Sequence, residues 1–246
     1  MTELTVVLTV GLAANRSEQF YPSWAALAGD TGTESAAAPV RAGDLDAALA
    51  GRSQLPWHPR DLHRWHLAAA PTVTVPPDYL GPGSAQYPVV VTLGDAKSAA
   101  APVAGVVTVA LAPTRATTAR ALSTLVLELR KDLRVTAQGW AVVAGAGETA
   151  LAGQLARALP AQFEALAVVQ RSPTAGLASL GRTPPGTALA VVRPASARTR
   201  SDKVPTGVTS LIAAAPKAWQ MATTWTARQL SPPLTAPLLL PTGSAQ

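Results

Sequence analysis

All three histidines of this 246-residue chain lie in one short stretch, at His58, His63 and His66. If the stretch is helical, His63 and His66 can share one metal ion, with His58 or Asp61 as a further ligand. Either of these two imidazoles can also act as a general base. Zinc hydrolases, however, usually place a helical histidine pair four residues apart. We therefore favour an amphipathic helix with a tryptophan anchor, in which Asp61 complements the helix dipole, and we expect no metal site.

A glycine-bearing turn is the second candidate for chemistry. Gly145, Gly147 and Ala150 match the pattern G-x-G-x-x-A between a predicted strand at 139–147 and a predicted helix at 148–160. Such glycines let the backbone approach a pyrophosphate, and the first N–H groups of the helix receive its charge. The same small residues also suit close packing of a strand on a helix, without any ligand. The predicted binding residues of this turn are Gly145, Gly147, Glu148 and Thr149.

Polar residues follow the next predicted strand. Gln170, Arg171 and Ser172 stand where proteins that bind a free ribose 2′-hydroxyl carry an acidic residue, so a 2′-phosphate would suit this position better. From the glycine turn to this point the chain resembles the NADP-binding unit of Rossmann-fold reductases. The resemblance implies NADP as the cofactor and hydride transfer as the reaction.

A second resemblance overlaps the first. Residues 166–194 run from a strand through Ser172 and a small-residue helix to a further strand, and they look like the final unit of SAVED domains. Residues 106–129 are similar to an earlier strand–helix unit of those domains. SAVED domains, which are related to CARF sensors, have paired Rossmann-like halves and bind cyclic oligonucleotides in bacterial antiphage signalling. The resemblance implies a basic pocket at the carboxyl ends of the strands. The residues that the two resemblances place near phosphates or bases are Arg171, Ser172, Thr174 and Arg182.

Several other chemistries are disfavoured by the sequence. No cysteine is present, which excludes disulfides, thiolate nucleophiles and cysteine-based metal sites. No G-x-S-x-G motif occurs, so Ser172 and Ser179 lack the glycine frame of a serine nucleophile. A P-loop would need glycine at 142 and lysine at 148, where Val142 and Glu148 stand. These absences favour a binding protein over an enzyme.

The overall charge favours anionic partners. Lys and Arg number 20 against 14 Asp and Glu, which gives a net charge of +6. Such a field attracts phosphates or nucleic acid, although a GC-rich genome also produces this arginine bias by default. A basic run follows the predicted strand at 187–196, and its residues are Arg193, Arg198, Arg200 and Lys203.

Elements that can position these residues are clearest in the middle of the chain. Val-rich apolar runs predict strands at 87–93, 105–113, 139–147, 163–172 and 187–196. Apolar stripes predict helices at 114–132 and 148–160. This alternation is typical of parallel crossover units. We therefore expect an α/β fold with a Rossmann-like, mainly parallel sheet flanked by helices.

The two ends of the chain are less regular. We expect a strand at Val6–Leu12, short helices from Asp44 to Ala50 and from Pro59 to Ala70, and helix on both sides of Pro216. Five prolines between residues 71 and 88 indicate an internal boundary. The expected division is an N-terminal region at 1–80, a core at 81–200 and a C-terminal helix with a proline-rich tail at 201–246. No apolar run reaches the roughly 18 to 20 residues that cross a bilayer. An acidic residue precedes the N-terminal apolar run, so we expect a cytoplasmic protein.

The function expected from these observations is non-catalytic binding or sensing of a nucleotide-type anionic ligand, either a cyclic oligonucleotide or NADP. One alternative is an NADP-dependent reductase. A second alternative is a structural subunit of a phage or secretion particle, with residues 71–88 and the proline-rich tail as contact arms. Such a protein would form a homo-oligomer or a larger assembly.

Overall fold

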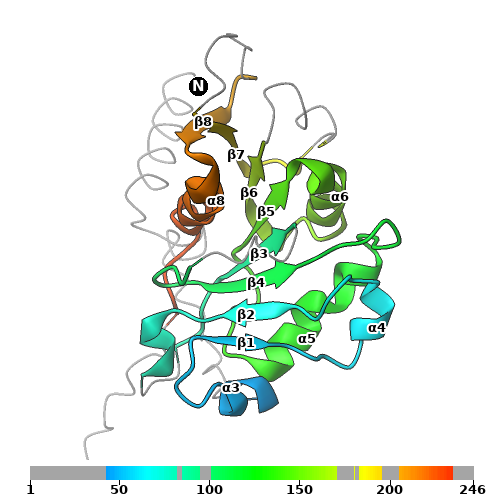
Figure 1. Cartoon of the computed structure of the whole chain (residues 1–246), viewed down its shortest axis with the longest axis vertical. Helices are drawn as coiled ribbons and strands as arrows, with labels where there is room; N and C mark the ends of the chain where they lie inside the picture. Colours follow the sequence, from blue (N-terminus) through cyan, green and yellow to red (C-terminus); the bar gives the residue numbers. More distant parts are fainter. Residues whose placement is uncertain are drawn as a thin grey trace, which may run out of the picture. The chain divides into compact units, whose positions relative to one another are not determined.

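The computed structural model describes residues 43–81, 85–94, 101–170, 180, 183–195 and 205–234. These residues fall within one compact unit. They form one eight-stranded sheet, which Figure 1 shows with β1 at one end and β8 at the other. Its strands are β1 Gln54–Pro56, β2 Thr72–Thr74, β3 Val89–Leu93, β4 Val107–Leu111, β5 Trp140–Gly145, β6 Phe163–Val169, β7 Ala188–Pro194 and β8 Val208–Ala213.

The sheet is mostly parallel. Its strand order is β1-β2-β4-β3-β5-β6-β7-β8, and only β2 runs antiparallel to its neighbours β1 and β4. The central strands are nearly continuous runs of Val, Leu and Ala because parallel strands are buried on both faces. The expected α/β class and the mainly parallel sheet are confirmed.

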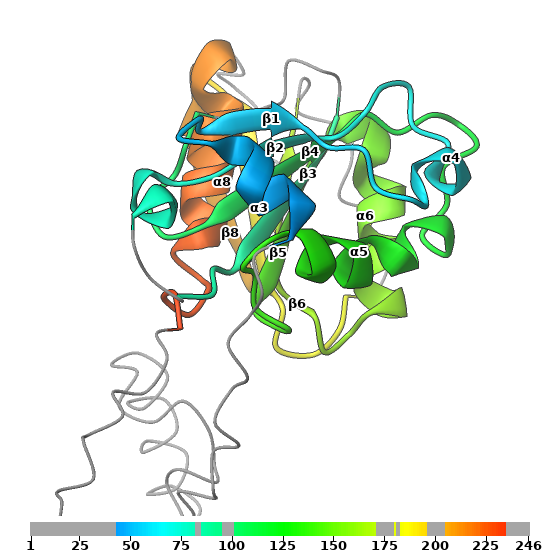
Figure 2. The ribbon, with the colours of Figure 1, turned by 90° about the horizontal axis from the view of Figure 1, so that it is seen from below.

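Helices cover both faces of this sheet. Figure 2 shows α8 on one face and α5 and α6 on the other. The α-helices are α3 Asp44–Leu49, α4 Leu62–Trp65, α5 Leu125–Asp132, α6 Thr149–Ala158 and α8 Ala218–Ala227. The short 3₁₀ turns are η1 Pro77–Leu80, η3 Ala121–Thr124, η4 Ala146–Glu148 and η5 Ala215–Lys217. Within the described ranges, no helix is both long enough and apolar enough to cross a bilayer.

The predicted strands agree well with the structure. All five predicted core strands are present, as β3, β4, β5, β6 and β7. The short helix from Asp44 is also present as α3, although Gly43 precedes it as the N-cap and no side chain caps it. The helix predicted for 114–132 is only partly correct, because residues 114–120 form a loop and regular helix starts at η3.

Two predicted helices are wrong. The helix expected at 59–70 shrinks to α4, since His66 adopts a left-handed backbone with φ 52° and the chain turns into β2. The N–H of Ala68 then bonds the carbonyl of Ala112 at 2.8 Å, which joins this segment to the end of β4. The helix expected before Pro216 is the strand β8, whose sequence starts with the β-branched residues Val208 and Thr209.

The proline-rich segment 71–88 contributes to the core. It contains β2 and η1, and its side chains Val73, Val75, Tyr79 and Tyr87 are at most 4% exposed. The segment thus combines buried side chains with the exposed residues Pro77, Asp78, Leu80 and Gly81, and its role as a contact arm stays a prediction. The predicted strand at Val6–Leu12 and most of the proline-rich tail lie outside the described residues.

Candidate functional site

The turn between β5 and α6 lies at the centre of the sheet. β5 pairs with β3 and β6, ends at Gly145, and passes through η4 into α6. This confirms the prediction that the glycine turn joins a strand to a helix. The carboxyl edge of a parallel sheet, where this turn stands, is the usual place for ligands in α/β proteins.

Thr149 holds the turn together. Its side chain is fully buried, and its hydroxyl lies 3.2 Å from the carbonyl oxygen of Gly145 and 3.0 Å from that of Ala146. The hydroxyl can donate to these acceptors and so ties the first turn of α6 back to the end of β5. The role of Thr149 in the structure is thus internal to the turn.

The two glycines of the turn have different surroundings. A Cβ atom on Gly145 would lie 2.6 Å from Oε2 of Glu148, 3.6 Å from Cζ2 of Trp219 and 3.7 Å from the carbonyl oxygen of Leu93. A Cβ atom on Gly147 would meet no heavy atom within 4 Å, and this residue is exposed. The open approach to the turn is therefore at Gly147, while the approach to Gly145 is filled.

The group that fills the space at Gly145 carries a negative charge. Glu148 is the N-cap residue of α6, where a carboxylate complements the positive end of the helix dipole. A phosphate seated against Gly145, as in a dinucleotide-binding turn, would have to displace this carboxylate, because two like charges at such a distance repel.

Strands further from β5 add positive charge to this edge of the sheet. Arg115 follows β4, Arg193 lies near the end of β7, and Lys217 lies in η5 after β8. Gln170 follows β6, is 5% exposed, and donates its backbone N–H to the carbonyl of Val192 at 2.9 Å. The other predicted ligand residues of this edge lie outside the described residues: Arg171, Ser172, Thr174, Arg182, Arg198, Arg200 and Lys203.

The histidine stretch is anchored by its tryptophans. Trp57 and Trp65 are buried, with ring centroids 5.5 Å apart, whereas His58, His63 and His66 are exposed. Among the described residues, no group of three or more His, Cys, Asp or Glu side chains could hold a metal ion.

Two threonine side chains hold the backbone of His66 in place. Its carbonyl oxygen accepts hydrogen bonds from the hydroxyls of Thr114 and Thr117, at 2.6 Å and 2.8 Å. Asp61 pairs with Arg64 at 3.3 Å rather than with an imidazole. The structure thus supports a tryptophan-anchored segment at this place.

The turn can also be compared with a nucleophile elbow. In α/β-hydrolases the catalytic serine stands at the apex of a sharp strand-to-helix turn above the sheet, and the triad histidine follows it in the chain. Gly147 occupies the apex here and carries no nucleophile. All three histidines precede it in the sequence. These 246 residues therefore hold no triad in the order that those enzymes use around this turn.

A separate cleft of about 290 Å³ lies between α3 and η1. It is lined by Asp46, Leu49, Tyr79, Leu80 and Arg134, among others. Arg134 follows α5 and precedes β5, so this cleft lies at the amino edge of the parallel strands, opposite the β5–α6 turn.

The polar groups of this cleft bond to one another. Arg134 Nε lies 3.3 Å from Asp46 Oδ2, its guanidinium lies over the ring of Tyr79, and its backbone N–H donates to the Tyr79 hydroxyl at 2.9 Å. Burial raises the pKa of Tyr79 above its ordinary value. These contacts link α3 to η1 and to the segment between α5 and β5, so the group serves as a structural network.

One neighbour of the turn could not be found from the sequence. Trp219 comes from α8, on the opposite face of the sheet from α6, and reaches Gly145 only because β8 returns the chain to this edge. Its spacing from Trp225 gives no signal of such a contact. Glu148 was a predicted ligand residue, but its carboxylate covers Gly145.

Comparisons with known proteins give little further guidance. No protein-family model matches the chain, and no curated protein matches it. Among solved structures, a ferulic acid esterase is similar over 72% of this chain and 97% of its own, with 12% identity and a TM-score of 0.46. A likeness at this level does not indicate a shared fold or function.

Proposed function

We propose that this protein is a non-catalytic binding protein that recognises a nucleotide-type anionic ligand at the β5–α6 turn. The observation that carries the proposal is the open, exposed position of Gly147 in η4, the turn that leads into the ten-residue helix α6. Backbone N–H groups at such a position attract anions without any specialised side chain. In this proposal the β5–α6–β6 crossover is a Rossmann-like unit, and the protein binds its ligand in the cytoplasm.

Two further features support it. Arg115 and Lys217 follow β4 and β8, and Arg193 lies near the end of β7, so the same edge of the sheet carries positive charge that raises the local concentration of anions. The apex of the turn lacks a nucleophile, so a bound molecule would not be attacked by the protein at that point. The contact is expected at Gly147 and not at Gly145, which Glu148 covers.

A ligand panel tests the proposal. Thermal unfolding of the full chain would be followed with inorganic phosphate, NADPH, and cyclic di- and trinucleotides. A ligand present at 100 times its Kd adds about 2.7 kcal/mol to the free energy of unfolding. If none of these compounds stabilises the protein, the proposal is rejected. A response to NADPH alone would favour the reductase alternative and would call for a hydride-transfer assay.

Two variants locate the binding site on the turn. Gly147→Leu places a side chain in the open approach, where the structure leaves room for it, so it should abolish binding and leave folding intact. Ala158→Leu adds the same side chain at an exposed position at the far end of α6 and should bind as the parent chain does. Equal binding by both variants would place the ligand elsewhere.

The charge of Glu148 provides a second test. Glu148→Gln removes the carboxylate from the turn and keeps the shape of the side chain. Affinity for an anionic ligand should rise, because a repulsive charge beside the site is lost. A fall in affinity would mean that the ligand offers a cation or a hydrogen-bond donor to this residue.

A further inference from the structure

The two edge strands of the sheet differ in how well they resist pairing with another chain. β1 has three residues and ends in Pro56, which has no backbone N–H. β8 has six residues, and its sequence VTSLIA contains no proline, glycine or charge. Short strands, prolines and charges are the devices by which proteins protect sheet edges. β1 carries two of them and β8 carries none.

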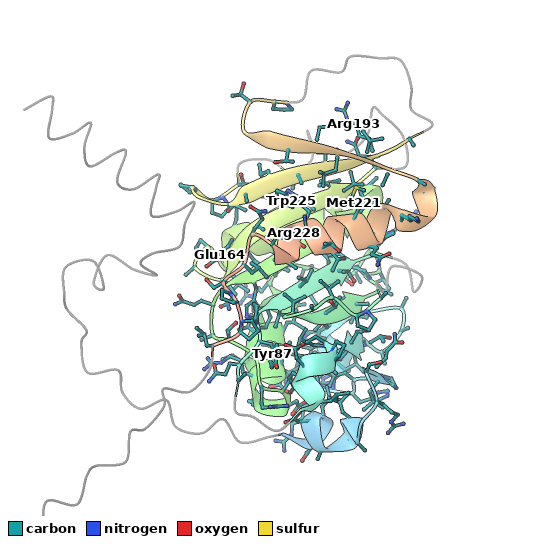
Figure 3. All side chains as sticks on the ribbon, turned by 90° about the vertical axis from the view of Figure 1, so that its left-hand side faces the viewer. Tyr87, Glu164, Arg193, Met221, Trp225 and Arg228 are labelled. Atoms are coloured by element: carbon teal, nitrogen blue, oxygen red, sulfur yellow. The ribbon has the colours of Figure 1, made fainter. Side chains whose placement is uncertain are left out.

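The outer edge of β8 is unpaired within the described residues. β8 pairs with β7 along its whole length, and the carbonyl of Ala213 accepts a further bond from Ala195, just after β7. On the other side, the N–H of Val208 bonds the carbonyl of Pro205 in the preceding turn. Figure 3 shows β8 at the upper edge of the ribbon, with α8 below it. Apart from the N–H of Val208, the backbone groups of β8 that point away from β7 have no hydrogen-bond partner among the described residues, so they can pair with another strand.

The side chains of β8 are also exposed in a way that fits a partner. Ile212 is 69% exposed, which is unusual for a β-branched apolar residue within a strand, and Ser210 on the same face is exposed as well. Leu211 and Ala213 point to the other face, toward α8. A strand added to this edge would cover Ile212 on one face and extend the layer beside α8 on the other.

We propose that β8 pairs with β8 of a second copy of this chain, antiparallel and centred on Ser210, to form one continuous sheet across a two-fold axis. An axis perpendicular to the sheet keeps both copies of α8 on the same face, and residues directly opposite each other must then point the same way. Centring on Ser210 satisfies this condition. It places Val208 opposite Ile212 of the second copy and Thr209 opposite Leu211 of the second copy.

Self-pairing fits this strand better than pairing with an unlike strand. Val208 and Ile212 are apolar and β-branched, and such cross-strand pairs stabilise a sheet. The strand carries no charge, so two copies meet without repulsion. A charged partner would find no complementary charge on β8 itself.

The size of the contact sets its expected strength. Pairing of six residues buries less surface than the about 1,200–2,000 Å² of a standard stable interface. The dimer is therefore expected to depend on protein concentration, and a covalent trap is the most direct test of its register.

Cysteine substitution supplies that trap because the chain has no cysteine of its own. Ser210→Cys places two thiols directly opposite each other, where Cα atoms about 4.5–5.5 Å apart suit a disulfide. Thr209→Cys is the matched control, one residue away, since its two copies would be about 8 Å apart and too distant to bridge. Mild oxidation of the full chain should give at least about tenfold more covalent dimer for Ser210→Cys. Equal yields would overturn the proposed register.

Charge substitutions test the pairing without oxidation. Ser210→Lys and Ser210→Asp each set like charges opposite each other and should weaken the dimer up to about fivefold in sedimentation analysis. An equimolar mixture of the two variants should recover the dimer, which a folding defect could not do. A parent chain that stays monomeric at its highest soluble concentration would overturn the proposal. So would a dimer that both charges leave unchanged, since the contact would then lie elsewhere.

Discussion

The two faces of the sheet are covered by helices that pack against side chains of different size. The face under α5 and α6 holds Trp57, Trp65, Trp140 and most of the buried leucines. On the α8 face, seven of the thirteen buried apolar residues in the described part of the chain are alanine. Small side chains let one helix pack close to the strands, whereas large ones fill a wider layer. The first face should therefore be sensitive to lost volume and the second to added volume.

Truncating a tryptophan on the face under α5 and α6 should have the largest effect on stability. Trp140 is fully buried, packs edge-on against Phe163, and donates its indole N–H to the carbonyl of Thr136 at 3.0 Å. Trp140→Ala should lower the free energy of unfolding by about 3–5 kcal/mol, as measured by urea titration. Trp140→Phe keeps much of the volume and should lose less. A loss under about 1 kcal/mol for the alanine variant would mean that this face can collapse around a cavity.

Removing one hydrogen bond from the same face should have an intermediate effect. The indole N–H of Trp57 donates to Oδ2 of Asp132 at 2.7 Å, and this carboxylate ends α5, where a negative charge opposes the helix dipole. Trp57→Phe should therefore cost about 1.5–3 kcal/mol, because the bond involves a charged group. Trp65→Phe removes a neutral bond to the Thr124 hydroxyl and should cost about 0.5–1.5 kcal/mol. If Trp65→Phe cost more stability than Trp57→Phe, lost volume and not the charge of the bonding partner would decide the cost.

Enlarging a buried residue on the α8 face should destabilise the protein, whereas the same change at an exposed position should not. Ala222 of α8 is fully buried against the sheet. Ala222→Leu should cost about 1–3 kcal/mol, since the added carbons cannot be accommodated without moving α8. Ala158→Leu, at the exposed end of α6, is the control and should change stability by less than about 0.5 kcal/mol. Similar stabilities for the two variants would remove the contrast between the faces.

The smallest expected effect on stability appears only at high pH. Burial raises the pKa of Tyr79, so the folded state holds the phenolic proton more tightly than the unfolded chain does. The stability linked to this group is complete below about pH 10, the ordinary tyrosine value, and is lost as pH rises above it. Tyr79→Phe should show a flatter fall in urea midpoint above that pH than the parent. Parallel curves for the two proteins would assign the alkaline transition to other groups.

Much of the parallel core could be predicted from local sequence. The runs that became β3, β4, β5, β6 and β7 are apolar and Val-rich because each strand is buried on both faces, and no distant contact is needed to recognise them. The errors fall where a distant strand decides the structure. β8 forms by pairing with β7, and the segment after α4 turns at His66 to reach the end of β4.

The candidate site shows the same division. Gly145 and Gly147 were recognisable because the pattern of a strand, two glycines and a helix is local. The sequence did not show which of the two glycines is open, because Glu148 folds back onto Gly145 and Trp219 reaches it from another element. The positions of Glu148 and Trp219 beside Gly145 depend on how the helices pack on the sheet, which the sequence does not show.

The sequence alone determined the α/β class, the strand–turn–helix at Gly145 and the absence of cysteine chemistry, since periodicity and composition are local properties. The tertiary structure decided the strand order, the unpaired edge at β8 and the carboxylate at the glycine turn. These features come from contacts between residues far apart in the chain, and such contacts leave no fixed spacing in the sequence.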